Sequence, residues 1–219
     1  MINSNKYGQY IAEHIQNLPI CEPVTTTAVA DALANAFGMD INNAKKITNV
    51  TMKRLTDKGE LTRVQKGIYG KTKITPFGKL TPNADEIIAG VLLRKDNATI
   101  GYITGPTLLN AVGLCSLVPK ERHITTNHYR RQVPAGINIR LHKPVVTVND
   151  ENARYLQAID MFMAMERYHV DTEKTDEILS NILQRSNINN EKLILYARKF
   201  GNSKILLKTI DIVLGGIEL

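Results

Sequence analysis

The sequence contains no Trp, and aromatic residues make up only 5% of its 219 positions. Proteins that hold unpaired bases stack them on aromatic side chains, so this composition disfavours single-stranded nucleic acid as a partner. The two cysteines, Cys21 and Cys115, are too few for a disulfide framework or a zinc site. Both are therefore expected to be reduced, buried thiols.

Long apolar segments are also missing. No run of 18 apolar residues occurs, which argues against a transmembrane helix. The first ten residues are polar and lack the apolar core of a secretory signal. The sequence therefore predicts a cytoplasmic protein with no membrane partner.

What the sequence does have is basic charge, since 28 Lys+Arg against 21 Asp+Glu give a formal net charge of +7. The excess is uneven: residues 1–80 carry +5, residues 81–150 carry +3 and residues 151–219 carry −1. A basic N-terminal part indicates a polyanionic partner, although charge says nothing about fold.

Apolar periodicity predicts three helices in this basic part, at residues 6–18, 25–37 and 40–58. The third is expected to begin at an Asp40 or Asn42 cap and to end at Gly59. Two short strands then flank a tight Lys66-Gly67 turn, in which Gly67 should adopt positive φ. Three helices followed by a β-hairpin is the order of a winged helix-turn-helix, which we assign to residues 1–72.

The third helix has an apolar stripe, formed by Ala44, Ile47, Thr51 and Leu55, and an opposite polar side. Asn can read adenine edges in the major groove, and Lys can reach guanine or phosphate. The hairpin adds further polar and basic residues. The predicted contacts to double-stranded DNA are Asn42, Lys45, Lys46, Asn49, Lys53, Arg63, Gln65, Lys66 and Lys71. A solvated helix face and a polar hairpin without any ligand would show the same pattern.

Residues 73–82 hold two prolines and a glycine and are interpreted as a linker to a second domain, residues 83–219. Within it, periodicity predicts a helix at 83–95, strands at 100–104, 123–127 and 137–142, and a short helix at 106–112. From residue 152 onward the pattern is helical throughout, with helices predicted at about 152–169, 174–186, 190–200 and 203–214. The predicted fold class is mixed α/β and helix-rich: a winged helix-turn-helix followed by an α+β domain that ends in a helical bundle.

Basic side chains also gather around the predicted strands of the second domain. This candidate C-terminal basic patch consists of Arg122, Arg130, Arg131, Arg140 and Lys143. Such a patch would suit an acidic protein or a nucleic acid. Lys and Arg at a sheet edge that discourage strand pairing are an equally good explanation.

Motifs for catalysis or cofactor binding are not found. Gly70-Lys71-Thr72 resembles the end of a P-loop, but Gln65 stands where the motif needs its first glycine. None of the five histidines lies at metal-ligand spacing from another His or Cys. Asp160 is interpreted as part of a solvated helix face, and Met161, Met163 and Met165 as flexible core filler. The expectation is a protein without catalytic residues, metal or cofactor, and thus not an enzyme.

Several segments resemble those of the AbiE-type antitoxins. They are LTRVQKGIYGK (61–71), GYITGPTLLNAVGL (101–114), HITTN (123–127) and the basic pair Arg130-Arg131. The order of these features covers most of the chain, although the helical part after Asn152 has no counterpart that can be matched segment by segment. The resemblance implies a repressor whose winged helix binds inverted repeats in its own promoter. It also implies a C-terminal domain that counteracts a nucleotidyltransferase-fold toxin encoded nearby, without requiring a tight complex.

Two other classes remain open at this point. One is a winged-helix transcription regulator whose C-terminal domain senses a ligand or binds a protein partner. The other is an enzyme with a DNA-targeting module, for which the sequence offers no acid–base or metal-binding constellation.

Overall fold

The computed structural model describes residues 4–214 except 20, 21, 77, 81, 82, 96, 134 and 135. The chain forms two compact units, residues 1–91 (unit 1) and 92–219 (unit 2). Both contain helices and strands, so the predicted mixed α/β, helix-rich class is confirmed. The division falls inside a helix, whereas the sequence places a linker at residues 73–82, where the structure has two short strands.

Unit 1 begins with three helices, α1 (Ser4–Asn17), α2 (Thr26–Phe37) and α3 (Ile41–Asp57). Thr25 caps α2, because its hydroxyl accepts a hydrogen bond from the backbone N–H of Ala28. Asp40 caps α3, where its carboxylate accepts from the N–H groups of residues 42 and 43. Of the two predicted caps of α3, the structure therefore selects Asp40 over Asn42.

The three helices enclose the core of unit 1, and α3 packs against both α1 and α2. Its fully buried side chains include Ile11 of α1, Leu33 of α2 and Met52 of α3. Gly38 ends α2 with φ +61°, a left-handed conformation that favours glycine, and so lets α3 follow closely.

A three-stranded sheet accompanies the helices of unit 1. It contains β1 (Val24–Thr25), β2 (Leu61–Gln65) and β3 (Ile68–Lys71) in the order β1-β3-β2, with antiparallel pairing throughout. Gly67, in the two-residue turn between β2 and β3, has φ +76°, which confirms its predicted conformation. The hairpin of β4 (Lys73–Thr75) and β5 (Gly78–Leu80) follows, and then α4 (Ala84–Leu93).

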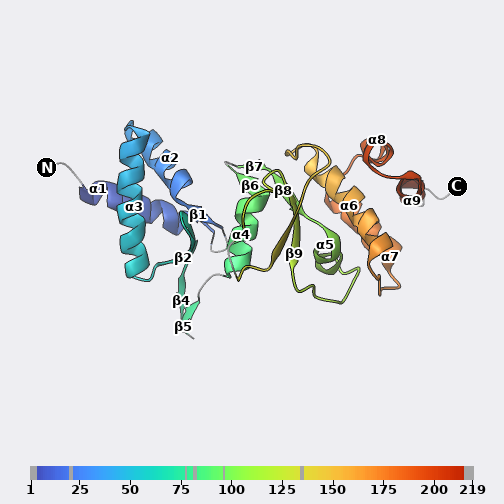
Figure 1. The fold of residues 1–219 in the computed structure, drawn as a ribbon, viewed down its shortest axis with the longest axis horizontal. Coiled ribbons are helices and arrows are strands. Elements are labelled where there is room, and N and C mark those ends of the chain that lie inside the picture. The colour runs from blue at the N-terminus through green and yellow to red at the C-terminus, as the bar shows by residue number, and fades with distance from the viewer. Residues whose placement is uncertain are drawn as a thin grey trace. The chain divides into compact units, whose positions relative to one another are not determined.

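Unit 2 contains a second three-stranded sheet in the order β10-β9-β8, of which β8 and β9 are labelled in Figure 1. Its strands are β8 (Gly101–Ile103), β9 (Arg122–Thr126) and β10 (Ile139–His142). β8 pairs antiparallel with β9, whereas β9 and β10 run parallel. β6 (Arg94–Lys95) and β7 (Ala98–Thr99) form a small hairpin before this sheet, and α5 (Gly105–Ala111) follows β8.

Four helices complete unit 2: α6 (Ala153–Arg167), α7 (Thr175–Arg185), α8 (Asn190–Phe200) and α9 (Ser203–Leu214). They lie within two residues of the predicted helices at each end. Helix α6 contributes most to the core, with Phe162 and Met161 fully buried among side chains of α5, α7, α8 and α9. Cys115 is buried and free, as expected, whereas Cys21 lies outside the described residues.

No helix in the described part of the chain is both long and apolar enough to span a bilayer.

The capping geometry of α3 gives the first prediction. Asp40→Ala removes the only side-chain acceptor seen at the N-terminus of α3 and should lower the free energy of unfolding by about 1 kcal/mol. The matched control is Asn42→Ala, an exposed position two residues on, which should cost less than about 0.5 kcal/mol. Urea unfolding followed by circular dichroism measures both, and equal losses would show that the Asp40 cap does not stabilise α3.

Candidate nucleic-acid interface and buried polar cluster

The polar side of α3 is exposed to solvent along its whole length. All five residues predicted on it are exposed: Asn42, Lys45, Lys46, Asn49 and Lys53, which together we call the outer face of α3. The opposite side is buried through Ala44, Thr48, Thr51, Met52 and Leu55. The predicted apolar stripe was therefore placed on the correct side, but it omitted Thr48 and Met52, and Ile47 is only half-buried.

Several exposed residues next to the outer face were not predicted, among them Asn43, Val50 and Arg54. Val50 follows Asn49 directly and keeps 52% of its surface exposed, which is unusual for a β-branched apolar side chain. Apolar side chains on a groove-binding helix contact the methyl group of thymine. A pattern search for polar residues cannot find such a position, because Val reads as a core residue.

The turn of the β2–β3 hairpin is attached to unit 1. The first backbone N–H of α2, at Thr26, donates to the carbonyl of Gly67 at 2.9 Å, which fixes the turn against the N-terminus of that helix. Arg63 and Lys66 are exposed on the hairpin, as a DNA contact requires. Gln65 is half-buried, and its Oε1 is buried without a hydrogen-bond partner. Gln65 is therefore poorly placed to reach a groove.

Lys71 has a structural position that the sequence did not suggest. Its ammonium donates hydrogen bonds to the carbonyls of Gln16 and, at 3.0 Å, Leu18, where α1 ends. A cation at a helix C-terminus satisfies carbonyls that the helix leaves unpaired and is favoured by the helix dipole. Lys71 is thus occupied within unit 1, and the prediction that it contacts DNA is not supported by its geometry.

The predicted basic patch of unit 2 does not lie on one face of the sheet. Arg122 is in register with Ile139, one position before the Arg140–His123 pair, so Arg122 and Arg140 point to opposite faces. Arg140 forms an exposed ion pair with Glu121 at 3.7 Å. Arg130 and Lys143 both lie over the ring of Tyr129, at 5.4 and 5.8 Å from its centroid, and Arg131 is exposed nearby in sequence.

The most concentrated polar chemistry of unit 2 surrounds Asp160 on α6. Three hydroxyl groups donate to its Oδ2: Tyr102 and Thr104 at 3.0 Å and Thr125 at 3.3 Å. The interpretation of Asp160 as part of a solvated helix face is therefore wrong. Its Arg and Lys neighbours in sequence suggested a polar surface, but the sheet covers this turn of α6.

The sheet places these donors in one row. Tyr102 of β8 pairs with Thr125 of β9, which pairs with His142 of β10, so the three side chains share a face. His123 lies two residues before Thr125 on the same face, and its Nδ1 is 3.1 Å from Nε2 of His142. We call Asp160, Tyr102, Thr104, Thr125, His123 and His142 the polar cluster. The search for paired histidines used their spacing in the sequence, which cannot detect two histidines that the parallel pairing of β9 and β10 brings together.

Burial shifts the acidities in the polar cluster. Desolvation raises the pKa of Asp160, and the hydroxyl hydrogen bonds oppose that shift. Burial, reinforced by the nearby carboxylate, raises the pKa of Tyr102 well above its usual range. The pKa of His142 is lowered mainly by desolvation and, to a smaller extent, by the charge of Arg140. The pKa of His123 is lowered mainly by desolvation and, to a smaller extent, by His142. Near neutral pH the two imidazoles are therefore uncharged, and one donates to the other.

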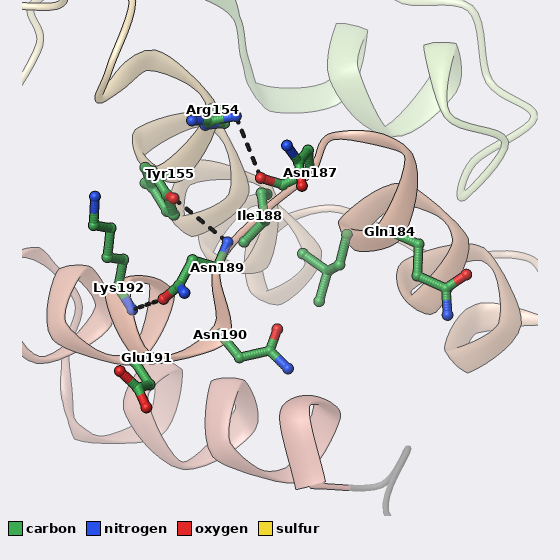
Figure 2. A pocket seen from close by; sticks show the side chains of 10 residues that line it. Arg154, Tyr155, Gln184, Asn187, Ile188, Asn189, Asn190, Glu191 and Lys192 are labelled. Carbon is green, nitrogen blue, oxygen red and sulfur yellow. Dashed lines mark hydrogen bonds between the residues drawn. The ribbon is translucent and has the colours of Figure 1, made fainter.

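A hollow with a volume of about 770 Å³ lies at the connection between α7 and α8 (Figure 2). Its polar groups serve the backbone: Arg154 donates to the carbonyl of Asn187, the hydroxyl of Tyr155 accepts from the N–H of Asn189, and the Asn189 side chain caps α8. Because these contacts stabilise the connection itself, this hollow is explained without a ligand. Within the described ranges, no group of three His, Cys, Asp or Glu side chains is arranged to hold a metal ion.

Comparison with known proteins gives one family. Residues 27–191 match the family of unknown function DUF6088. The match covers well over half of the chain and extends into both units, which is sufficient to assign the chain to that family. None of the curated proteins matches the sequence.

The lowered pKa values of the imidazole pair predict a pH-dependent stability. Below the ordinary His pKa of about 6.5 the unfolded chain binds protons that the folded chain resists, so the stability present above pH 6.5 is lost as the pH falls. His142→Asn removes one of the two histidines and also removes the charge of a protonated His142 that acts on His123. The loss of stability with falling pH should therefore be smaller in this variant. The groups facing the pair, Arg140, Glu121 and Asp160, stay in place.

Calorimetric melting temperatures between pH 5 and 7.5 measure this effect. The matched control is His169→Asn, which replaces an exposed histidine of the same unit and should leave the slope as it is in the wild type. Parallel slopes for the wild type and His142→Asn would contradict the assignment of the acid-sensitive step to the imidazole pair.

Proposed function

The chain belongs to DUF6088, and we propose that it is a transcription regulator that binds double-stranded DNA through unit 1. In this proposal unit 1 is a winged helix-turn-helix with α3 as its recognition helix. The order α1, β1, α2, α3, β2, β3 and the sheet order β1-β3-β2 support that assignment.

The outer face of α3 is the observation that carries the proposal. It presents two Asn and three Lys side chains to solvent on a helix of 17 residues, about 25 Å long, whose opposite side is buried. The major groove accepts one helix, in which Asn49 and Asn42 can pair with adenine edges. Lys45, Lys46 and Lys53 supply the phosphate or guanine contacts on which affinity depends.

The β2–β3 hairpin fits the role of a short wing. Its turn is anchored to α2 through the Gly67 carbonyl, while Arg63 and Lys66 remain exposed. Contacts from a fixed hairpin orient a helix on the duplex without reading bases. We accordingly assign Arg63 and Lys66 to phosphate contacts and leave Lys71 and Gln65 out of the interface.

The antitoxin role is the more specific form of this proposal and rests on the resemblance to AbiE-type antitoxins. The resembling segments 101–114 and 123–127 form β8, α5 and β9, the structural centre of unit 2. Unit 2 would then counteract the nucleotidyltransferase-like toxin, while unit 1 represses the shared promoter. The alternative, a regulator whose unit 2 responds to a ligand, is supported by the polar cluster and is developed below.

Charge reversal on α3 tests the DNA-binding proposal. Lys46→Glu with Lys53→Glu should abolish binding to promoter DNA, because two phosphate contacts become repulsive. Both side chains are exposed, so the melting temperature should change little. Electrophoretic mobility shift or fluorescence anisotropy at several salt concentrations measures the effect, and neutral Gln at both positions should reduce the salt slope by about two.

The control for that experiment is Lys174→Glu with Lys192→Glu, two exposed lysines of unit 2 that give the same change in net charge. It should retain binding. If the control loses binding as fully as the test variant, net charge rather than α3 governs the interaction. Undiminished binding by the Lys46 and Lys53 variant would reject α3 as the recognition helix.

The antitoxin role makes a separate prediction. When the full-length Lys46→Glu, Lys53→Glu variant is coexpressed with the toxin-like neighbour, growth should be rescued although promoter repression is lost. The reason is that the two activities would reside in different units. A growth assay and a promoter–reporter assay in the same strain measure both. Loss of rescue together with repression, or a neighbour that is not toxic, would leave the plain transcription regulator.

A further inference from the structure

A cavity of about 180 Å³ in unit 2 opens beside the polar cluster. Asp160, His123, His142 and Thr125 line its inner part, and Lys143 and Arg167 belong to its exposed part. Gly105 also lines it, with φ +59°, and a Cβ there would lie 3.0 Å from Nδ1 of His123. Glycine at this position therefore lets the backbone pass close to the imidazole pair.

The carboxylate of Asp160 has one oxygen to spare. All three hydroxyl donors bind Oδ2, and within the described residues Oδ1 receives no hydrogen bond. Oδ1 is not among the buried polar atoms that lack a partner, and Asp160 lines the cavity, so we infer that Oδ1 is the acceptor on the cavity side. A hydrogen bond from an N–H donor stabilises a carboxylate oxygen most strongly where that oxygen has lost most of its water.

The exposed end of the cavity has the opposite character. Lys143 and Arg167 carry positive charge there, and neither forms an ion pair in the described part of the chain, whereas the neighbouring Arg140 is paired with Glu121. Two cations without carboxylate partners at the mouth of a cavity favour an anion, and Arg in particular fits carboxylate and phosphate groups. The two neutral imidazoles between the ends add no charge.

We propose that this cavity binds a small ligand with two poles, an amino group that donates to Oδ1 of Asp160 and an anionic group held by Lys143 and Arg167. The site uses none of the residues assigned to the DNA interface of unit 1. Its volume is well below the roughly 300–1,000 Å³ of sites for drug-sized molecules. α-Amino acids and nucleoside monophosphates share the required chemistry, the latter with the base inside and the phosphate at the mouth.

Thermal shift of the full-length protein with two panels tests the site. One panel contains α-amino acids and the other nucleoside monophosphates. Each has controls that lack one pole: carboxylic acids without the amine, alkylamines, nucleosides and inorganic phosphate. At about 100 times its Kd, a true ligand should raise Tm by about 5–10 °C, and the one-pole controls should not. A response confined to one panel identifies the class of ligand.

Variants then test whether the ligand identified by thermal shift binds in this cavity. Arg167→Gln and Lys143→Gln should each weaken it about 10-fold to 100-fold by calorimetry, since each removes a charged hydrogen bond at an exposed position. Arg185→Gln, an exposed arginine of α7 outside the cavity, is the matched control and should bind as the wild type does. Asp160→Asn should abolish binding, but its loss of hydrogen bonds can also affect folding.

The proposal is overturned if neither panel stabilises the wild type, or if one-pole analogues bind as well as the complete ligands. It is also overturned if Arg167→Gln and Lys143→Gln both bind with wild-type affinity. DNA binding by the Lys46→Glu, Lys53→Glu variant has no bearing on these results.

Discussion

The packing of α6 on the sheet of unit 2 depends on the half-buried carboxylate of Asp160. A carboxylate cannot leave water without donors, because desolvation costs several kcal/mol. Here Tyr102 on β8, Thr104 before α5 and Thr125 on β9 all donate to a single oxygen, Oδ2. Hydrogen bonds to a charged group contribute about 1.5–3 kcal/mol each and offset part of that cost, since the pKa of Asp160 stays raised despite them. Helix α6 is thereby held in one register against the sheet, with Phe162 and Met161 directed into the core.

That register has consequences beyond stability. With Oδ2 saturated, Oδ1 is left facing the cavity, and the cross-strand row that supplies Thr125 also brings His142 beside His123. Gly105 is then required by the approach of its backbone to His123. One half-buried carboxylate thus links the packing of α6 to the polar atoms that remain for the proposed ligand, so stability and the proposed binding share the same residues.

Features set by short stretches of sequence were predictable, and features set by distant pairing were not. The Gly67 turn and the ends of α8 and α9 follow from local signals that act within a few residues. The polar cluster needs the parallel pairing of β9 with β10, and its Asp160 contacts join residues 35 to 58 positions apart. Nothing near Asp160 in the sequence distinguishes it from a solvated acid. For the same reason Lys71 was taken for a surface charge, although it joins β3 to the end of α1.

Lys71 also shows why the charge of a segment is a poor measure of its interface. Affinity for a duplex depends on the number of cations that reach phosphates, and Lys71 is bound to carbonyl groups within its own unit. Lys66, five residues earlier on the same hairpin, is exposed. The excess of +5 in residues 1–80 therefore overstates the charge that could reach DNA, and the proposed interface is better defined by exposure and position. On that criterion the proposed interface consists of the outer face of α3 with Arg63 and Lys66, whose long side chains are solvated and would exchange that water for the groove on binding.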